Sequence, residues 1–183
     1  QEKALLKEAE TAKEKYEKLK ETIELLQGKY DLCRLKLPSP EKLILVKAMR
    51  GDISKLVEIE KQLTGSKTYS AMTDENEWLD EFEKGAIIYL IKKDNEILGN
   101  VSYEKRKDRS IYISGLAIIP RFQKQGIGRE VLRRILEELN GFSRIDLVTH
   151  PENPAVKLYE SLGFKIESRK ENYYGDSEPR LIL

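Results

Sequence analysis

The chain of 183 residues is long enough for one domain of ordinary size and a smaller additional segment. Its 33 basic and 32 acidic side chains give a formal charge of +1, so charge does not indicate a nucleic-acid-binding protein. The single cysteine, Cys33, excludes an internal disulfide and a cysteine-based metal site, and it favours a reducing cytoplasm. No apolar stretch approaches the roughly 18 residues of a membrane span, and the charged N-terminus is not typical of a signal peptide.

Residues 1–27 are predicted to form one helix, because apolar residues recur along them with alternating spacings of four and three. These residues are Leu5, Ala9, Ala12, Tyr16, Leu19, Ile23 and Leu26. The stripe has the heptad pattern of a weak coiled coil, which fits either packing on the chain's own domain or a homodimer. Gly28 ends the predicted helix, and the sequence LPSP at 37–40 prevents regular structure in the connection to the next segment. We therefore predict an N-terminal segment at 1–38 and one domain at 39–183.

The 39–183 domain has the pattern of a mixed α/β fold. Asp52 is expected to cap its first helix, and Asp74 and Glu77 form a predicted capping box for the second. In chain order we predict a strand at 42–49, helices at 53–64 and 75–84, strands at 86–93, 97–105 and 109–119, a helix at 127–139, a strand at 144–149, a helix at 153–163, and strands at 164–168 and 180–183. This order implies a central mixed sheet with helices on both faces.

The sequence RFQKQGIGRE at 121–130 places Gly126 and Gly128 where a helix is expected to begin. A glycine inside a helix is about 1 kcal/mol less favourable than alanine, so two glycines in a first turn need another explanation. A glycine-rich turn between a strand and a helix exposes backbone N–H groups at the positive end of the helix dipole, which favours an anion. Lys124 and Arg129 add positive charge. We therefore predict a phosphate-binding turn rather than a tight turn without a ligand.

Two common phosphate-binding motifs do not match this turn. A P-loop requires G-x-x-x-x-G-K-[ST], and the second half of that motif and its lysine are missing here. A dinucleotide-binding fingerprint requires Gly or Ala at position 131, which is Val131, and it opens a parallel βαβ unit rather than following an antiparallel run. Neither motif explains the turn.

The sequence QKQGIG at 123–128 resembles the Q/R-x-x-G-x-G/A signature of the GNAT superfamily of N-acetyltransferases. The sequence NPAVKLYESLGF at 153–164 is similar to that family's N-x-x-A-x-x-L-Y-x-x-x-G-F helix, at the expected distance downstream. The resemblance covers roughly residues 41–183 and looks closest to the branch of RimI and the protein N-terminal acetyltransferases. It implies the GNAT fold, with acetyl-CoA as co-substrate and no metal.

The resemblance also implies which residues hold the co-substrate. Residues 123–129 would bind the pyrophosphate of acetyl-CoA, and the 110–119 strand would splay from the 144–149 strand so that pantetheine pairs between them. Asn153 would cap its helix and also contact the coenzyme. The implied coenzyme-binding residues are Leu116, Ala117, Ile118, Gln123, Lys124, Gln125, Gly126, Ile127, Gly128, Arg129 and Asn153.

Acetyl transfer from a thioester to an amine needs a neutral amine, stabilisation of the tetrahedral oxyanion, and a proton for the departing thiolate. The resemblance assigns the oxyanion donor to a backbone N–H near Ile118, where the strand is expected to bulge. It assigns the proton donor to Tyr159, the tyrosine of the matched helix. The alternative for Tyr159 is a packing residue with its hydroxyl at the surface.

The general base stays open at this point. Val148 stands where several relatives carry His or Glu, whereas Tyr112 matches a position at which relatives have Glu or Tyr. Tyr112 ranks first and would orient a water molecule, because a phenol with an ordinary pKa of about 10 is a poor base at neutral pH. His150 is the alternative, although a lone histidine in a loop is more often a hydrogen-bonded residue. Glu104 and Asp146 are expected to be solvated strand residues.

The acceptor site is implied by the last part of the chain. The sequence RKENYYGDSEPRLIL at 169–183 resembles the closing hairpin of protein acetyltransferases, so Tyr173 and Tyr174 are candidate substrate-binding residues, with Tyr69 on the opposite wall. We predict an N-acetyltransferase acting on a protein N-terminal or lysine amine. The alternatives are a small-molecule amine, such as a polyamine, amino acid or aminoglycoside, and a non-catalytic acyl-CoA-binding module.

Overall fold

The computed structural model describes Lys15, residues 17–22 and residues 43–183. The chain divides into two units, 1–41 and 42–183. In the first unit the described residues are helical, as the heptad pattern predicts, and Leu19 is 59% exposed. The rest of the 1–27 helix, the linker and Cys33 lie outside the described residues. The homodimer, the 38/39 boundary and the cytoplasmic location therefore stay predictions.

The second unit has the predicted order of strands and helices. Its strands are β1 (Ile44–Lys47), β2 (Ile87–Lys93), β3 (Glu96–Lys105), β4 (Ser110–Ile118), β5 (Arg144–Thr149), β6 (Ser168–Lys170) and β7 (Arg180–Ile182). Its helices are α2 (Ile53–Lys61), α3 (Glu75–Lys84), α4 (Ile127–Glu138) and α5 (Val156–Ser161), with the short 3-10 helices η1 (Arg50–Asp52) and η2 (Pro120–Phe122). Within the described ranges, no helix has the length and apolarity that crossing a membrane would need.

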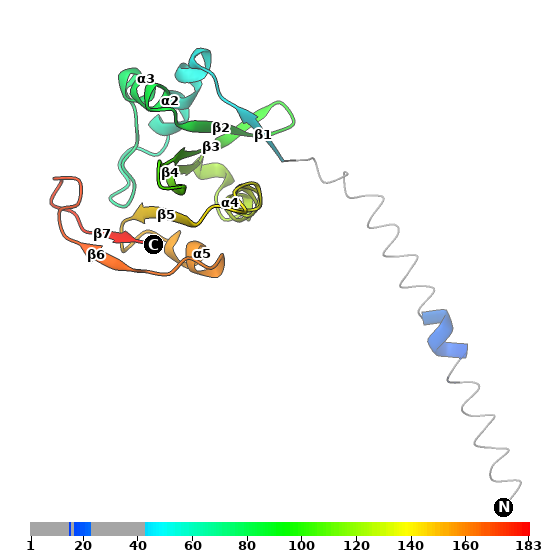
Figure 1. The fold of residues 1–183 in the computed structure, drawn as a ribbon. Helices are drawn as coiled ribbons and strands as arrows, with labels where there is room; N and C mark the ends of the chain where they lie inside the picture. The colour runs from blue at the N-terminus through cyan, green and yellow to red at the C-terminus, as the bar shows by residue number, and fades with distance from the viewer. Residues whose placement is uncertain (1–14, 16, 23–42) are drawn as a thin grey trace, which may run out of the picture. The chain divides into compact units, whose positions relative to one another are not determined.

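The seven strands form one mixed sheet in the order β1-β2-β3-β4-β5-β7-β6. β4 and β5 are parallel and the other neighbours are antiparallel. Helices α2 and α3 lie on one face of the sheet, and α4 and α5 lie on the other (Figure 1). The fold class predicted from the sequence is confirmed.

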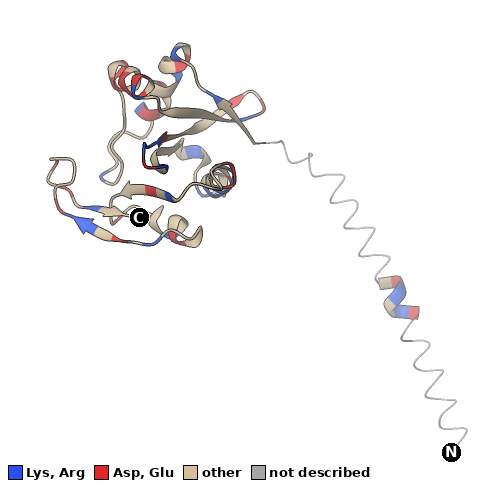
Figure 2. Ribbon diagram, in the orientation of Figure 1, with Lys and Arg blue, Asp and Glu red and all other residues tan. Residues whose placement is uncertain are grey.

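Charged residues are spread over the helices, strands and loops of the second unit, and both signs occur together (Figure 2). Helix α4 is an example, because Arg133 pairs with Glu130 at 2.9 Å and also with Glu137 along its exposed face. Such pairs between exposed side chains contribute little to stability. The distribution agrees with the sequence analysis, in which charge does not indicate a partner.

Each face of the sheet has its own apolar core, because successive strand residues point to opposite faces. On the α4 and α5 side, Ile111, Leu132 and Leu147 are buried in one cluster. On the α2 and α3 side, Leu56 and Trp78 belong to a second cluster. Val131, Leu132 and Ile135 of α4 are buried, and they are among the apolar residues that recur at helical spacing in this segment.

One predicted helix cap is confirmed and one is wrong. The Asp74 carboxylate accepts the N–H of Asn76 at 2.9 Å, and the Glu77 carboxylate accepts the N–H of Asp74 at 3.3 Å, which completes the capping box of α3. Asp52 makes no side-chain cap on α2. It closes η1 instead by accepting the N–H of Met49 at 3.0 Å, because the 3-10 turn before α2 directs its carboxylate backwards.

The strand predicted at 164–168 is also wrong in position, since β6 begins at Ser168. Phe164 is held by the end of α5, where its N–H donates to the Tyr159 carbonyl at 3.2 Å and its ring meets the Tyr159 ring edge-on at 6.1 Å. Residues 164–166 therefore form a connection after the helix, and the first hydrogen bond to β7 is the one that the Glu167 N–H donates to the Ile182 carbonyl at 2.9 Å.

β3 and β4 approach each other unusually closely at Gly99. A Cβ at Gly99 would lie 1.9 Å from the carbonyl oxygen of Ala117 and 3.1 Å from the Cα of Ile118. Both contacts are with backbone atoms, which cannot move aside as a flexible side chain can. Only glycine therefore allows the observed register between Gly99 and Ile118.

We expect Gly99→Ala to lower the free energy of unfolding by about 1 to 3 kcal/mol, because a β-strand backbone has to shift. Gly51→Ala is the matched control, since a Cβ there meets nothing within 4 Å and its φ is not positive. Urea denaturation followed by circular dichroism measures both variants. Equal unfolding free energies for the two would contradict the explanation.

Candidate active site

The sheet opens between β4 and β5. Their pairing runs from Ser110 with Arg144 to Ile113 with Leu147 and then stops, so residues 114–118 have no strand partner on the β5 side. A β-bulge at Ser114 marks the same point, because Ser102 pairs with Gly115 and Tyr103 with Ile113. The splay predicted between these strands is present, although the bulge lies four residues before the position expected at Ile118.

Backbone N–H groups alternate in direction along β4, and this places the N–H of Ile118 in the opening. The N–H of Ile119 donates to the Leu98 carbonyl on β3 at 2.9 Å. In an antiparallel pair, neighbouring residues point their N–H groups to opposite sides, so the N–H of Ile118 points toward the β5 side. The Ala117 side chain is 1% exposed and belongs to the core on the α2 and α3 side. An unpaired donor at Ile118 therefore results from the splay and not from a bulge.

The turn before α4 carries a row of unpaired backbone donors. Among the residues that the structure describes, the backbone N–H groups of residues 124–129 have no hydrogen-bond acceptor. Lys124 and Gly126 have φ of 59° and 79°, which turns the chain so that several N–H groups are exposed together. The side-chain amides of Gln123 and Gln125 donate to the carbonyls of Ile118 and Arg121, at 2.8 and 3.1 Å. In this structure both glutamine side chains thus brace the turn.

The two glycines of the turn have different structural needs. Gly126 is in the left-handed region, which a residue with a Cβ rarely adopts. Gly128 has ordinary helical geometry, and a Cβ there would make normal contacts of 3.6 to 3.9 Å with Leu158, Leu116 and Ile118. The fold does not require glycine at 128. Its missing Cβ leaves space beside the apolar side chains that line the opening.

Tyr159 lies in α5 and is 8% exposed. Its ring packs edge-on against Phe164, and its hydroxyl has no hydrogen-bond partner among the described residues. Burial raises the pKa of Tyr159 to about 12. The hydroxyl therefore keeps its proton at neutral pH, and no described group holds it in place.

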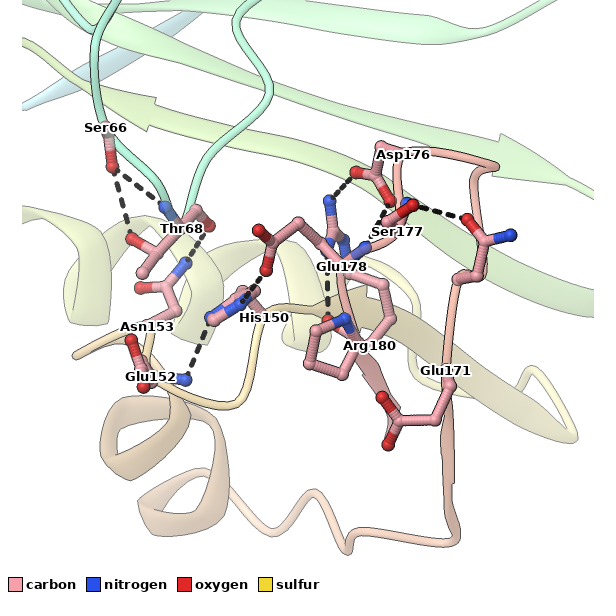
Figure 3. Close-up of polar contacts among 12 residues, drawn as sticks. Ser66, Thr68, His150, Glu152, Asn153, Glu171, Asp176, Ser177, Glu178 and Arg180 are labelled. Atoms are coloured by element: carbon pink, nitrogen blue, oxygen red, sulfur yellow. Dashed lines mark hydrogen bonds and ion pairs between the residues drawn. The ribbon is translucent and has the colours of Figure 1, made fainter.

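Asn153 is not the N-cap of α5, which is Ala155 without a side-chain cap, so this predicted cap is wrong in position. Its side chain stabilises the turn before the helix instead, because its Oδ1 accepts the N–H of Ala155 at 2.9 Å. Its Nδ2 donates to the carbonyl of Thr68 at 3.3 Å, in the connection between α2 and α3 (Figure 3). Figure 1 shows that connection reaching past β4 toward the end of β5. Asn153 thus joins two segments that are distant in the sequence.

His150, the alternative base, is 6% exposed at the end of β5. Its Nδ1 accepts the N–H of Glu152 at 3.1 Å, and its Nε2 lies 3.2 Å from the Glu178 carboxylate. With Nδ1 used as an acceptor, the proton of the neutral ring is on Nε2. Both ring nitrogens are engaged, so His150 has the geometry of a hydrogen-bonded loop residue.

Three tyrosines meet at the β6–β7 hairpin. The hydroxyls of Tyr112 and Tyr174 are 3.2 Å apart, and the rings of Tyr173 and Tyr174 meet edge-on at 4.7 Å. Tyr173 is 38% exposed and Tyr174 is 55% exposed, so both present ring surface to solvent. Burial, and then the hydrogen bond with Tyr174, raises the pKa of Tyr112 above its ordinary value. Tyr112 therefore stays protonated at neutral pH.

Tyr69 lies in the α2–α3 connection and is bound to a buried carboxylate that the sequence analysis missed. Its hydroxyl donates to Glu60 at 3.0 Å, and Glu60 also accepts from Asn100 at 3.0 Å and from the Met72 N–H at 3.3 Å. Glu60 is 1% exposed, and burial raises its pKa although the three donors lower it. A signal was present, because Glu60 falls on the apolar stripe of α2, four residues after Leu56.

Of the two strand carboxylates expected to be solvated, Asp146 is buried and Glu104 is only partly exposed. Asp146 is 7% exposed and pairs with Arg106 at 2.9 Å and with Arg144, because these cations lie over its side of the sheet. Glu104, the register partner of Tyr112, is half-buried, and burial followed by the nearby Glu81 raises its pKa. Within the described part of the chain, no group of three or more His, Cys, Asp or Glu side chains could hold a metal ion.

Comparison with known proteins gives a consistent set of relatives. A family model described as Acetyltransferase (GNAT) family matches residues 53–164. The ribosomal protein bS18-alanine N-acetyltransferase of Escherichia coli K12 is 37% identical over 68 residues, which are 36% of this chain and 46% of that protein. N-acetylaspartate synthetase of Danio rerio is 29% identical over 93 residues, 49% of this chain and 33% of that protein. These matches span less than half the length of each relative.

Solved structures share the fold over a larger part of the chain. The crystal structure of the ribosomal-protein-S18-alanine N-acetyltransferase from Escherichia coli has a TM-score of 0.66 at 20% identity, covering 77% of this chain and 91% of that chain. Mutant forms of the spermidine/spermine N-acetyltransferase SpeG from Vibrio cholerae have a TM-score of 0.62 at 20% identity, covering 77% and 92%. At 20% sequence identity, these similarities show a shared fold.

Proposed function

The chain belongs to the GNAT family of acetyltransferases, and from this we propose that it transfers the acetyl group of acetyl-CoA to a primary amine. Transfer is by direct attack in a ternary complex, with a protein N-terminus as the preferred acceptor. One observation carries this proposal. The splayed β4 strand and the turn at residues 124–129 both present unpaired backbone N–H groups, and the space beside Gly128 is lined by Leu116 and Ile118 of β4 and by Leu158, which precedes Tyr159 in α5.

The proposed coenzyme site fits the chemistry of acetyl-CoA. The backbone N–H groups of 124–129, at the N-terminus of the twelve-residue helix α4, suit a pyrophosphate. The edge of β4 at residues 116–118 has no strand partner on the β5 side and suits the amides of pantetheine, which can pair with it as a strand would once the Gln123 amide leaves the Ile118 carbonyl. Lys124 and Arg129 supply positive charge at the phosphate end, and Asn153 lies just before α5, the helix of Tyr159.

In the proposed reaction, the acceptor nitrogen attacks the thioester carbon, an N–C bond forms and the C–S bond breaks. The amine loses one proton and the departing sulfur gains one, so the products are an amide and the free thiol of CoA. The N–H of Ile118 stabilises the oxyanion, and Tyr159 donates to the sulfur. Tyr112, which stays protonated, orients the water that takes the proton of the amine.

The charges around the proposed acceptor site favour a protein N-terminus over a polyamine. A polyamine carries several positive charges and needs several uncompensated carboxylates, because a buried charge must be paired. Asp176 and Asp146 are paired with Arg180 and Arg106, and Glu60 is 1% exposed and enclosed by Tyr69 and Asn100. Glu104 and Glu178 form no ion pair with Lys or Arg among the described residues, and two such carboxylates are fewer than the several charges of a polyamine require. The exposed rings of Tyr173 and Tyr174 offer apolar surface and hydroxyls suited to a peptide.

Gly128→Ala tests the coenzyme site separately from the fold. Alanine should raise the free energy of unfolding by up to about 1 kcal/mol, because glycine is the poorer helix former and the new Cβ makes ordinary contacts. The same methyl group should weaken acetyl-CoA binding by about tenfold or more by occupying the space left for the ligand. Calorimetric titration and urea denaturation measure the two effects. If the variant is more stable but binds acetyl-CoA as tightly as the wild type, the coenzyme does not bind beside Gly128.

Tyr159→Phe should lower kcat by about 100-fold or more, since general acid catalysis contributes roughly 10² to 10⁴ in rate. Its dissociation constant for acetyl-CoA and its stability should change little, because no described residue bonds to the hydroxyl. Tyr103→Phe is the control, since it removes a buried hydroxyl that bonds to Glu138 on the α4 side of the sheet. Equal turnover in the wild-type protein and Tyr159→Phe would show that Tyr159 is not the proton donor.

The acceptor class is tested by thiol release with a panel of amines. We expect turnover with peptides that have a free N-terminus and none with the same peptides carrying a blocked N-terminus and no lysine. Spermidine, free amino acids and aminoglycosides should react at least about tenfold more slowly at equal concentration. Turnover confined to small amines would show that the acceptor is a small molecule and not a protein. Tight acetyl-CoA binding without turnover on any amine would indicate a non-catalytic module.

A further inference from the structure

The β5–α5 connection, residues 150–155, contacts both walls of the proposed acceptor site. Toward one wall, Asn153 donates to the Thr68 carbonyl at 3.3 Å, directly before Tyr69. Toward the other wall, the His150 Nε2 meets the Glu178 carboxylate at 3.2 Å, in the segment that carries Tyr173 and Tyr174. Figure 3 shows His150 and Asn153 close together, with contacts to Glu178 and to Thr68.

The connection itself is stiffened by local hydrogen bonds. The N–H of Asn153 donates to the His150 carbonyl at 3.0 Å, and the N–H of Glu152 donates to the His150 Nδ1 at 3.1 Å. The Asn153 side chain accepts the N–H of Ala155 at 2.9 Å. Because these bonds fix the His150 ring relative to Asn153, the two walls are held at a set separation.

The hairpin segment 171–179 has few other polar contacts with the domain. Most of its bonds are internal to the hairpin, where the Asn172 carboxamide accepts the Ser177 N–H at 2.7 Å and Asp176 pairs with Arg180. Among the hydrogen bonds of the described residues, two join this segment to elements outside the hairpin. They are the Tyr112–Tyr174 hydroxyl pair and the His150–Glu178 contact. Of these two, the second is anchored on a buried ring beside the connection to α5, the helix of Tyr159.

We propose that His150 is a positioning residue for the acceptor, which acts through Glu178 to hold the 171–179 hairpin over the reaction site. The inference rests on the proposed function, since the acceptor site belongs to it. His150 does not touch the reacting atoms in this arrangement. Losing its Nε2–H leaves Glu178 without its partner and frees one end of the hairpin, so the acceptor binds less tightly while the chemical step is preserved.

Steady-state kinetics test the role. His150→Ala and Glu178→Ala should each raise the KM for a peptide acceptor by about tenfold or more, the worth of one hydrogen bond to a charged group. The values of kcat and of the KM for acetyl-CoA should stay within about twofold. The double variant should be no worse than either single variant, because both remove one contact. Glu171→Gln, which loses an exposed pair with Arg169 in the same segment, should match the wild type.

Because His150 is buried, His150→Ala could raise the acceptor KM through a folding defect alone. A conservative variant separates this effect from the loss of the hydrogen bond. His150→Gln keeps an Nε2–H donor at a similar distance, so its acceptor KM should stay near that of the wild type. An unchanged acceptor KM in His150→Ala, additive effects in the double variant, or a loss confined to kcat would each overturn the positioning role.

A readout without substrate separates this inference from the proposed function. Hydrogen exchange of the 172–178 amides should be faster in His150→Ala and Glu178→Ala than in the wild type and in Glu171→Gln. Unchanged exchange in these amides would overturn the inference whatever the kinetics. If the wild type acetylates no peptide but the exchange is faster in the two variants, the proposed protein acceptor is wrong. The contact between His150 and the hairpin is then still supported.

Discussion

The parting of β4 from β5 is the constraint on which the proposed chemistry depends. Parallel strands normally satisfy each other's backbone groups, and here the pairing ends after Ile113 and Leu147. Among the described residues, Gln123 pairs with the Ile118 carbonyl on the open edge, while the N–H groups of residues 124–129 have no acceptor. In the proposed site, a ligand with amides at one end and phosphates at the other pairs with both parts. The proposal therefore assigns coenzyme recognition to the backbone more than to any side chain.

Sequence analysis predicted the parts of the structure that depend on local chemistry. The capping box of Asp74, the turn at Gly126 and the order of strands and helices follow from residues that are close in the chain. The family resemblance rested on two such local motifs, and the family match at 53–164 confirms it. The strand at 164–168 failed because the packing of Phe164 on Tyr159 overrides a local apolar pattern.

The parts that could not be predicted depend on contacts between distant segments. Asp146 is buried against Arg106, which lies 40 residues away in the sequence. Glu60 is buried against Asn100 at the same separation, although the neighbouring Glu58 is exposed. Hydrophobic periodicity shows which face of a helix or strand is buried, but it does not show which side chain will lie opposite. Buried polar pairs therefore appear only when the fold is assembled.

The elements of the proposed coenzyme site form one uninterrupted stretch from β4 to α5, whereas the walls of the proposed acceptor site come from the segments that flank this stretch. The proposed site thus assigns catalysis and substrate choice to separate parts of the chain. On this proposal, a change in either flanking loop alters the acceptor site and leaves the residues that bind the acyl donor in place. Such a division of labour makes the scaffold suited to acquiring new acceptors by loop replacement.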